Sequence, residues 1–541
     1  MIEVPVLIVG GGPVGLTASL LLSREGVRSL LVERHPGTAV LPKARGINAR
    51  TMEMYRQMGV EADIRAVGAP AKFGKMILWA ESLTGKEIKR LEPGRRSAEN
   101  LAVSPSANCT CAQDLLEPVL RRHAEALAPE GLCFNMELKT ISAGDIGVTG
   151  ELLDRATGQV IPFRAQYVIA ADGAHSPVRN MLGIGRTGDK DIYDSVNVHC
   201  EVDLRPWTAD RPAALYYIDQ PDLRATFLTI NGADRWGFLV HSLSVYGFTE
   251  ENLTPERCVG LVRRAVGVPD IPVKVLGISF WKCSAMVSDA FQKGRIFLAG
   301  DAAHETTPSG GFGLNLGVQD AQNIAWKLAA VIRGNASPSL LDTYEAERRP
   351  VAKEVVKATF LNMQSLGRTE KQSEAKLPRA QYLNEQGLIF GARYESSAVA
   401  PDSSTLPAVA DAVTQYVPSA YPGCRAPHIW LTRLGEKIST IDLFGSRFVL
   451  LAGRNGAAWR DAGGAQLRCP VDIYVIGDDV VDEEGQWAEV YGVEDGGAVL
   501  VRPDGYVGWR MRSLPDHPRR VLAAALEVLL GEPVDTSEVV H

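Results

Sequence analysis

Three glycines near the N-terminus have the spacing of a phosphate-binding turn. Gly10, Gly12 and Gly15 follow an apolar stretch at 4–9 and precede an apolar-periodic segment at 16–24. Gly10 permits a tight turn from strand to helix, Gly12 lets a pyrophosphate approach the backbone, and Gly15 allows close packing of helix on sheet. The helix N-terminus would offer free N–H groups and partial positive charge to the phosphates.

An acidic residue completes this unit. Glu33 closes the next expected strand, at 27–32, and Arg34 follows it. The carboxylate can accept both ribose hydroxyls of an adenosine. Because strand, turn, helix, second strand and acid occur in order, we predict a dinucleotide site rather than a structural glycine turn.

Two later segments favour FAD over NAD. Asp172 follows an expected strand in 167–170, and Asp301 follows another in 295–299. An aspartate at the end of a strand can hold a ribityl hydroxyl. The backbone of 308–315 can wrap an isoalloxazine ring, and the helix after it would direct its positive end at the N1/C2=O side of reduced flavin.

Together these segments resemble the fingerprints of the para-hydroxybenzoate-hydroxylase class of flavoprotein monooxygenases: GxGxxG, DGxxSxVR, and GD followed by a Pro-x-Gly-Gly turn. The segment 41–53 is also similar to that family, and the resemblance assigns Arg45 to the FAD phosphates and Gln113 to the ribityl chain. The expected cofactor contacts are Gly10, Gly12, Pro13, Val14, Gly15, Glu33, Arg34, Arg45, Gln113, Asp172, Asp301, Pro308, Gly311, Gly313, Leu314 and Asn315.

The resemblance runs along the whole chain and implies an α/β fold with a Rossmann-like FAD-binding domain, a mostly antiparallel β-sheet substrate domain and a C-terminal thioredoxin-like domain. The closest likeness is to bacterial hydroxylases of anthracycline- and angucycline-type aromatic polyketides and to phenol hydroxylases. The expected domains are 1–75, 100–186 and 287–345 for FAD, 76–99 and 187–286 for substrate, 346–425 for a helix and linker, and 426–541 for the thioredoxin-like domain.

The cysteines do not support thiol chemistry. A redox-active thioredoxin fold needs C-x-x-C, whereas Cys424 and Cys469 are far apart. Cys109 and Cys111 form a C-x-C pair without the second pair or His cluster of a zinc site. We therefore expect no metal and a structural C-terminal domain.

The resemblance implies a single-component hydroxylase. NADPH or NADH, a transient co-substrate without a second GxGxxG, reduces FAD; O2 then forms a C4a-hydroperoxide that oxygenates a phenolic or aromatic polyketide ring. Two alternatives stay open: a Baeyer–Villiger-type or antibiotic-inactivating flavin monooxygenase, and a non-catalytic protein that binds FAD or aromatic ligands.

No acid–base residue stands out. His304 follows the Gly-Asp pair, but a histidine there is more often structural than catalytic. Six aromatic residues could line a flat pocket, with ordinary β-domain core as the alternative for each: Tyr216, Tyr217, Phe227, Trp236, Phe238 and Trp281.

Bulk composition fits a cytoplasmic enzyme. The 541 residues carry a formal charge of −7, and mean hydropathy is −0.03. This balance argues against a nucleic-acid partner, and no apolar run reaches the roughly 18 residues of a membrane span. We expect a monomer or homodimer whose partners are a small aromatic substrate and O2.

Overall fold

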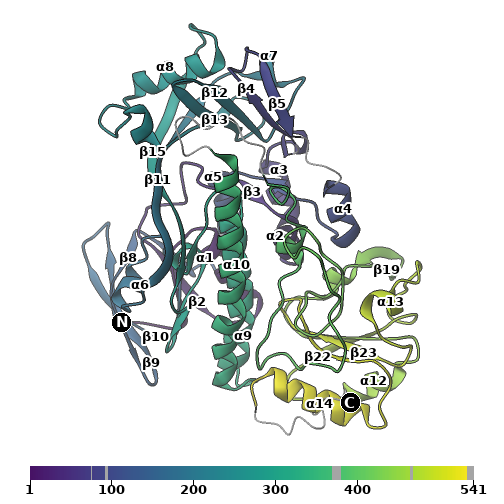
Figure 1. The fold of residues 1–541 in the computed structure, drawn as a ribbon. Helices are drawn as coiled ribbons and strands as arrows, with labels where there is room; N and C mark the ends of the chain where they lie inside the picture. The colour runs from purple at the N-terminus through teal and green to yellow at the C-terminus, as the bar shows by residue number, and fades with distance from the viewer. Residues whose placement is uncertain (75, 92–95, 368–378, 464–466, 533–541) are drawn as a thin grey trace.

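The structure is a computed structural model and describes residues 1–74, 76–91, 96–367, 379–463 and 467–532. Figure 1 shows one large sheet to the left of long central helices, a second sheet above them, and a third α/β unit at lower right. Parts of the ranges expected for the substrate domain, the linker and the C-terminal domain lie outside the described residues.

The first sheet is the dinucleotide-binding sheet. Its strand order is β16-β17-β10-β1-β2-β7, and the β8–β9 hairpin extends it from β10. The strands are β1 Ile2–Val9, β2 Ser29–Glu33, β7 Leu132–Phe134, β8 Met136–Gly144, β9 Gly147–Asp154, β10 Val160–Ala170, β16 Gln292–Lys293 and β17 Ile296–Leu298. Because β2, β1, β10 and β17 pair in parallel, their carboxyl ends meet at one edge.

Three helices pack together over this sheet. They are α1 Pro13–Arg24, α5 Gln113–Leu127 and α9 Gly313–Ile332, and α1 contacts both of the others. Pro13 opens α1 at a position where its missing N–H costs nothing. Apolar residues on both sides of β1, including Val6 and Leu7, are fully buried, as expected for a strand covered on both faces.

The second sheet has the order β18-β15-β11-β14-β13-β12-β4-β5. Every pair is antiparallel except β12 with β4. Its strands are β4 Ile77–Ala80, β5 Glu87–Leu91, β11 Arg186–Glu201, β12 Leu215–Gln220, β13 Leu223–Thr229, β14 Arg235–His241, β15 Lys274–Ser288 and β18 His304–Glu305. Helix α8, Pro255–Val266, covers one face; Thr254 caps its start and Gly267, at φ +90°, ends it.

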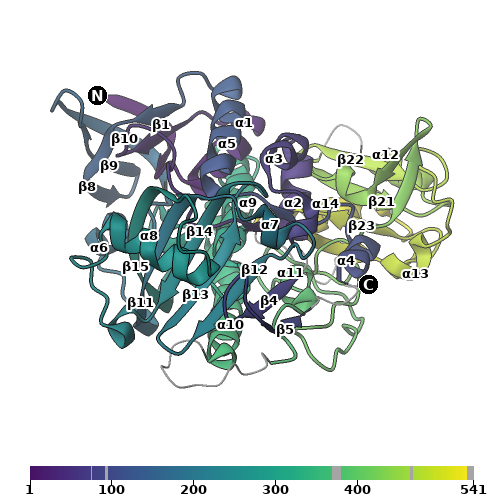
Figure 2. The same ribbon diagram turned by 90° about the horizontal axis from the view of Figure 1, so that it is seen from above.

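The C-terminal unit has the thioredoxin-like arrangement. Its sheet order is β22-β21-β23-β24, with β21 parallel to β22 and antiparallel to β23. The elements are β19 Trp430–Arg433, β20 Glu436–Ser439, β21 Phe448–Ala452, α12 Ala457–Ala462, β22 Val471–Val475, α13 Trp487–Tyr491, β23 Ala498–Val501, β24 Val507–Met511 and α14 Pro518–Leu529. Seen from above, these strands lie on the side of α2 (Ala49–Gln57) and α3 (Glu61–Val67), away from β8–β10 (Figure 2).

The expected fold class is confirmed. The helix expected within 346–425 belongs to α10, Thr343–Leu366, and the expected linker contains the short helix α11, Gln386–Phe390. Helices α5 and α8 and the β8–β9 hairpin were not predicted from the sequence.

Candidate active site

A large cavity lies between the carboxyl edge of the first sheet and one face of the second. Its volume is about 2420 Å³, whereas a pocket for one drug-sized ligand usually occupies about 300–1,000 Å³. Fifteen of the sixteen predicted cofactor residues line it; the exception is Gly15. The cavity therefore has room for a dinucleotide together with a second molecule.

The glycine turn forms one wall of the cavity. Gly10 has φ +110°, and a Cβ there would overlap the carbonyl oxygen of Ala171. A Cβ on Gly15 would overlap the carbonyl oxygen of Gly10, so Gly15 serves packing behind the wall. A Cβ on Gly12 would meet no protein atom closer than the Glu117 Oε1, at 3.9 Å. The space at Gly12 therefore belongs to the cavity, as an approaching pyrophosphate requires.

The carboxylate of Glu33 accepts two hydrogen bonds from the neighbouring backbone. Its Oε2 accepts the Gly11 N–H at 2.7 Å, and its Oε1 accepts the His35 N–H at 2.9 Å. The carboxylate thus fixes the glycine turn while lining the cavity.

Asp172 and Asp301 have different surroundings. Asp172 accepts the Ser176 hydroxyl at 2.6 Å and the Val178 N–H at 3.0 Å, which holds the short helix α6, Pro177–Met181. Asp301 is surrounded by the protein, but its side chain is exposed to the cavity that it lines. Burial raises the pKa of Asp301, and the charges of His304 and Lys43 oppose that rise.

The turn before α9 is fixed by one amide. Asn315 Oδ1 accepts the Asn48 N–H at 2.9 Å, and Asn315 Nδ2 donates to the carbonyls of Gly46 at 2.9 Å and Gly311 at 2.6 Å. Gly311 has φ +70°, where a side chain would be strained. Pro308, Gly313 and Leu314 line the cavity beside them. We call residues 308–315 the ring turn.

His304 does not line the cavity. It is 1% exposed, and its Nε2 lies 2.6 Å from Asp320 Oδ2. Asp320 also accepts the Gly300 N–H at 3.0 Å and the Arg348 Nε–H at 2.8 Å. His304 is therefore part of the buried support behind the Gly300–Asp301 pair, and this position gives it no contact with a substrate.

Arg45 and Gln113 are both occupied by protein groups. Arg45 donates to the carbonyls of Ala214 and Thr229, in the second sheet's domain rather than at the glycine turn. Gln113 Nε2 donates to Glu117 Oε1 at 2.6 Å. Arg45 therefore contacts the second sheet's domain and Gln113 contacts Glu117, while both side chains line the cavity.

Four of the six predicted substrate residues do not line the cavity. Tyr216, Phe227, Trp236 and Phe238 are fully buried in the core on the α8 side of the second sheet. Tyr217 and Trp281 do line it. The physical reason is strand alternation, which sends neighbours such as Tyr216 and Tyr217 to opposite faces.

Sequence reasoning also missed several cavity residues. On the face of Tyr217 lie Ser195, Leu228, Leu239 and His241, and strand alternation was the signal that could have found them. His241 Nδ1 lies 2.8 Å from the Ser195 hydroxyl.

Glu117, which also lines the cavity, was not predicted either. Its carboxylate accepts the Ala39 N–H at 2.5 Å, and burial raises the pKa of Glu117.

Comparison with known families shows which family this chain belongs to. Residues 3–359 match the FAD binding domain family, and residues 419–533 match the C-terminal domain of aromatic-ring hydroxylases. The chain belongs to the FAD-dependent aromatic-ring hydroxylases. FAD is therefore the cofactor of this hydroxylase, and the open space at Gly12 fits its pyrophosphate.

Relatives match the hydroxylase over nearly its full length. It is 38% identical to tetracenomycin A2 monooxygenase-dioxygenase of Streptomyces glaucescens, covering 99% of this chain and 98% of that one. It is 38% identical to 4-methyl-5-nitrocatechol 5-monooxygenase of a Burkholderia species, covering 98% of each. The crystal structure of aklavinone-11 hydroxylase with FAD and aklavinone superposes with a TM-score of 0.87 at 35% identity, covering 98% and 99%.

Two further observations describe what the hydroxylase lacks within the ranges given above. No described helix is both long and apolar enough to cross a lipid bilayer. Among the same residues, no group of three or more His, Cys, Asp and Glu side chains is arranged to hold a metal ion.

Proposed function

We propose that this hydroxylase oxygenates a phenolic ring of an aromatic polyketide. The observation that carries the proposal is the continuous cavity that runs from the glycine turn, past the ring turn, to the Tyr217 face of the second sheet. That face combines Tyr217 and Trp281 with Leu228 and Leu239, which suits a flat apolar molecule with a polar edge.

The cofactor contacts follow from the cavity wall. We assign the FAD pyrophosphate to Gly12 and the open N-terminus of α1, the ribityl chain to Asp301, and the isoalloxazine ring to the ring turn. Bound FAD supplies the redox and oxygen-activating chemistry. The chain's own residues orient the substrate, and the apolar side chains of the wall exclude water from its ring, which strengthens electrostatic interactions there.

The nicotinamide co-substrate, NADPH or NADH, has no dinucleotide motif of its own. We propose that it binds transiently and that substrate binding accelerates flavin reduction. A ring turn held by glycines at positive φ, Gly310 and Gly311, is compatible with more than one flavin position.

Stopped-flow reduction tests the proposal. The enzyme is mixed with NADPH or NADH in the presence of single-ring phenols, catechols or polycyclic aromatic polyketides, and products are analysed after reaction with labelled O2. We expect reduction to be fastest with a polycyclic phenol, and one oxygen atom from O2 to appear on its ring. Product oxygen derived from water would exclude the monooxygenase mechanism, and insertion beside a ketone would make this a Baeyer–Villiger enzyme.

Asp301→Ala tests the cofactor assignment separately. Loss of one hydrogen bond to a charged group, about 1.5–3 kcal/mol, should weaken FAD binding about tenfold to hundredfold. Unchanged affinity would show that the ribityl chain is held elsewhere.

A further inference from the structure

A turn of the C-terminal domain is buried inside the rest of the molecule. Residues 502–506 join β23 to β24, and Gly505 makes the turn possible at φ +78°. Arg502 and Asp504 are 0% and 1% exposed. Charged side chains are rarely buried so completely unless they are paired. The two side chains pair with each other, Arg502 Nη2 lying 2.5 Å from Asp504 Oδ2. Further partners lie on the helices α9 and α10.

Two central helices supply most of these partners. Arg502 donates to both carboxylate oxygens of Glu347 on α10, at 2.6 and 2.8 Å. Asp504 accepts the Trp326 Nε1–H of α9 at 3.2 Å, and Lys327 of α9 donates to Glu347 at 2.7 Å. Two cations and two anions therefore neutralise each other away from water. Removing one of them leaves a buried charge without its partner.

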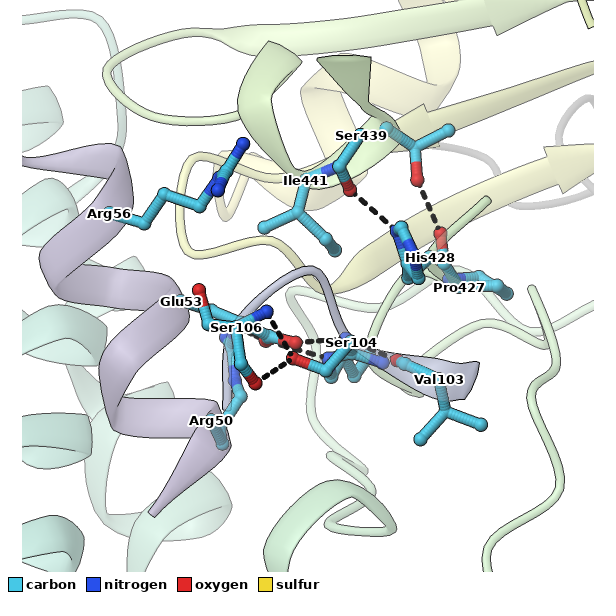
Figure 3. Close-up of polar contacts among 12 residues, drawn as sticks. Arg50, Glu53, Arg56, Val103, Ser104, Ser106, Pro427, His428, Ser439 and Ile441 are labelled. Carbon is cyan, nitrogen blue, oxygen red and sulfur yellow. Dashed lines mark hydrogen bonds and ion pairs between the residues drawn. The ribbon is translucent and has the colours of Figure 1, made fainter. Parts of the chain in front are cut away.

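Helix α2 is held by the same domain. Arg50, in its first turn, donates to the Asp504 carbonyl at 2.9 Å and to Gln322 Oε1 of α9 at 3.2 Å. Glu53, one turn later, pairs with Arg425 of the C-terminal domain. Figure 3 shows Arg50, Glu53 and Arg56 projecting from α2 towards that domain, with the segment from Val103 to Ser106 beside Glu53.

The N-termini of these two helices meet at the ring turn. Asn48 caps α2 and donates its N–H to Asn315, at the start of α9. Trp326 lies 11 residues after Asn315, about 16 Å along a helix that rises about 1.5 Å per residue. Since a helix is stiff along its axis, a shift at Trp326 also moves Asn315. The buried turn and the Asn48–Asn315 bond thus fix the same pair of helices at two points.

We propose that Asp504 and Arg502 are positioning residues for the cofactor. Through α2 and α9, the C-terminal domain sets the position of the ring turn, and so has a role in FAD binding that requires no thiol. This inference rests on FAD being the cofactor, and it does not depend on which substrate the enzyme oxygenates.

The test uses full-length Asp504→Asn, which keeps the shape of the side chain and removes its charge. FAD affinity is measured by fluorescence quenching of the refolded or stripped apoprotein, and the flavin midpoint potential is measured on the loaded enzyme. We expect affinity to fall about tenfold, in the lower range for coupling between distant sites, and the midpoint potential to shift. Wild-type affinity and potential in a folded variant would overturn the proposal.

Two controls separate positioning from stability. Arg468→Ala cuts another contact of the C-terminal domain, to the Asn335 carbonyl beyond the opposite end of α9. Val449→Ala weakens the core of that domain without touching α9. Both should bind FAD within about twofold of wild type at temperatures where they are folded. If Val449→Ala weakens FAD binding as much as Asp504→Asn does, general destabilisation explains the effect and the proposal fails.

A milder variant covers the case in which Asp504→Asn does not fold. Trp326→Phe removes one hydrogen bond to Asp504 and keeps an aromatic ring in place. We expect FAD binding to weaken severalfold in this variant, and wild-type affinity would refute the positioning role equally well.

Discussion

Replacing Gly12 with alanine should separate cofactor binding from folding. The backbone at Gly12 has φ −76°, which alanine adopts freely, and the new Cβ would lie 3.9 Å from its nearest protein atom. Because Gly12 is the N-cap residue of α1, a position where alanine is disfavoured, we expect the apoprotein to lose at most about 1 kcal/mol of stability. The methyl group would occupy the space that the pyrophosphate needs.

The loss in binding can be worked out from that displacement. Moving a phosphate away from one backbone N–H removes a hydrogen bond to a charged group, worth about 1.5–3 kcal/mol. FAD affinity should therefore fall about tenfold to hundredfold. Thermal unfolding of the apoprotein measures the first effect, and titration calorimetry with FAD measures the second.

Gly15→Ala is the matched control. Its Cβ would overlap the Gly10 carbonyl oxygen, so this variant should lose apoprotein stability as well as FAD. Wild-type FAD affinity in Gly12→Ala would refute the assignment of the pyrophosphate. An apoprotein destabilised as severely as Gly15→Ala would refute the claim that Gly12 faces open space.

Three further predictions concern other parts of the molecule. Burial lowers the pKa of His428 from 6.5 to about 4. Between these two pH values the unfolded chain binds a proton that the folded protein does not bind, so the free energy of unfolding should fall by about 3 kcal/mol as pH drops from 6.5 to 4. His428→Gln should flatten the melting temperature across that window, and an unchanged slope would contradict the assignment. Burial raises the pKa of both Cys424 and Cys469 to about 11, so replacing both with serine should leave turnover within a few-fold; abolished turnover in a folded double variant would reveal thiol chemistry. Trp281→Leu should raise KM for the aromatic substrate about tenfold without loss of FAD, whereas Phe238→Leu should lower the melting temperature and leave KM unchanged; the reverse pattern would mean that the cavity face has been misassigned.

The sequence predicted best what depends on neighbouring residues. The turn at Gly10–Gly15 is a local motif, because its glycines follow one another within a single strand-turn-helix unit, although the atom that crowds Gly10 belongs to Ala171 after β10. Short apolar runs at 4–9 and 27–32 predicted the strands β1 and β2, while the fold class came from the family resemblance. The family resemblance added the order of the domains.

Long-range placement was harder to predict. Tyr216 and Tyr217 are adjacent, and both faces of their sheet are apolar, one against α8 and one against the cavity. Alternation alone cannot say which of two apolar faces meets the ligand. The pairing of Glu347 with Arg502 joins residues far apart in the chain, and no local pattern marks either of them as a partner. The carbonyl acceptors of Arg45 likewise lie far along the chain, in the second sheet's domain, and no local pattern predicts them.

The chain passes from the FAD-binding domain into the main block of the second sheet along β11 and returns along β15, and these two strands pair with each other. Arg186 at the start of β11 lies opposite Ser288 at the end of β15. Exchanging residues 187–287 between family members would preserve that junction, which makes it a natural crossover point for recombination. The exchanged block would still have to match the strands β4 and β5, which the host chain contributes at the edge beside β12. Chimeras built to alter substrate choice should therefore carry residues 77–91 along with the block.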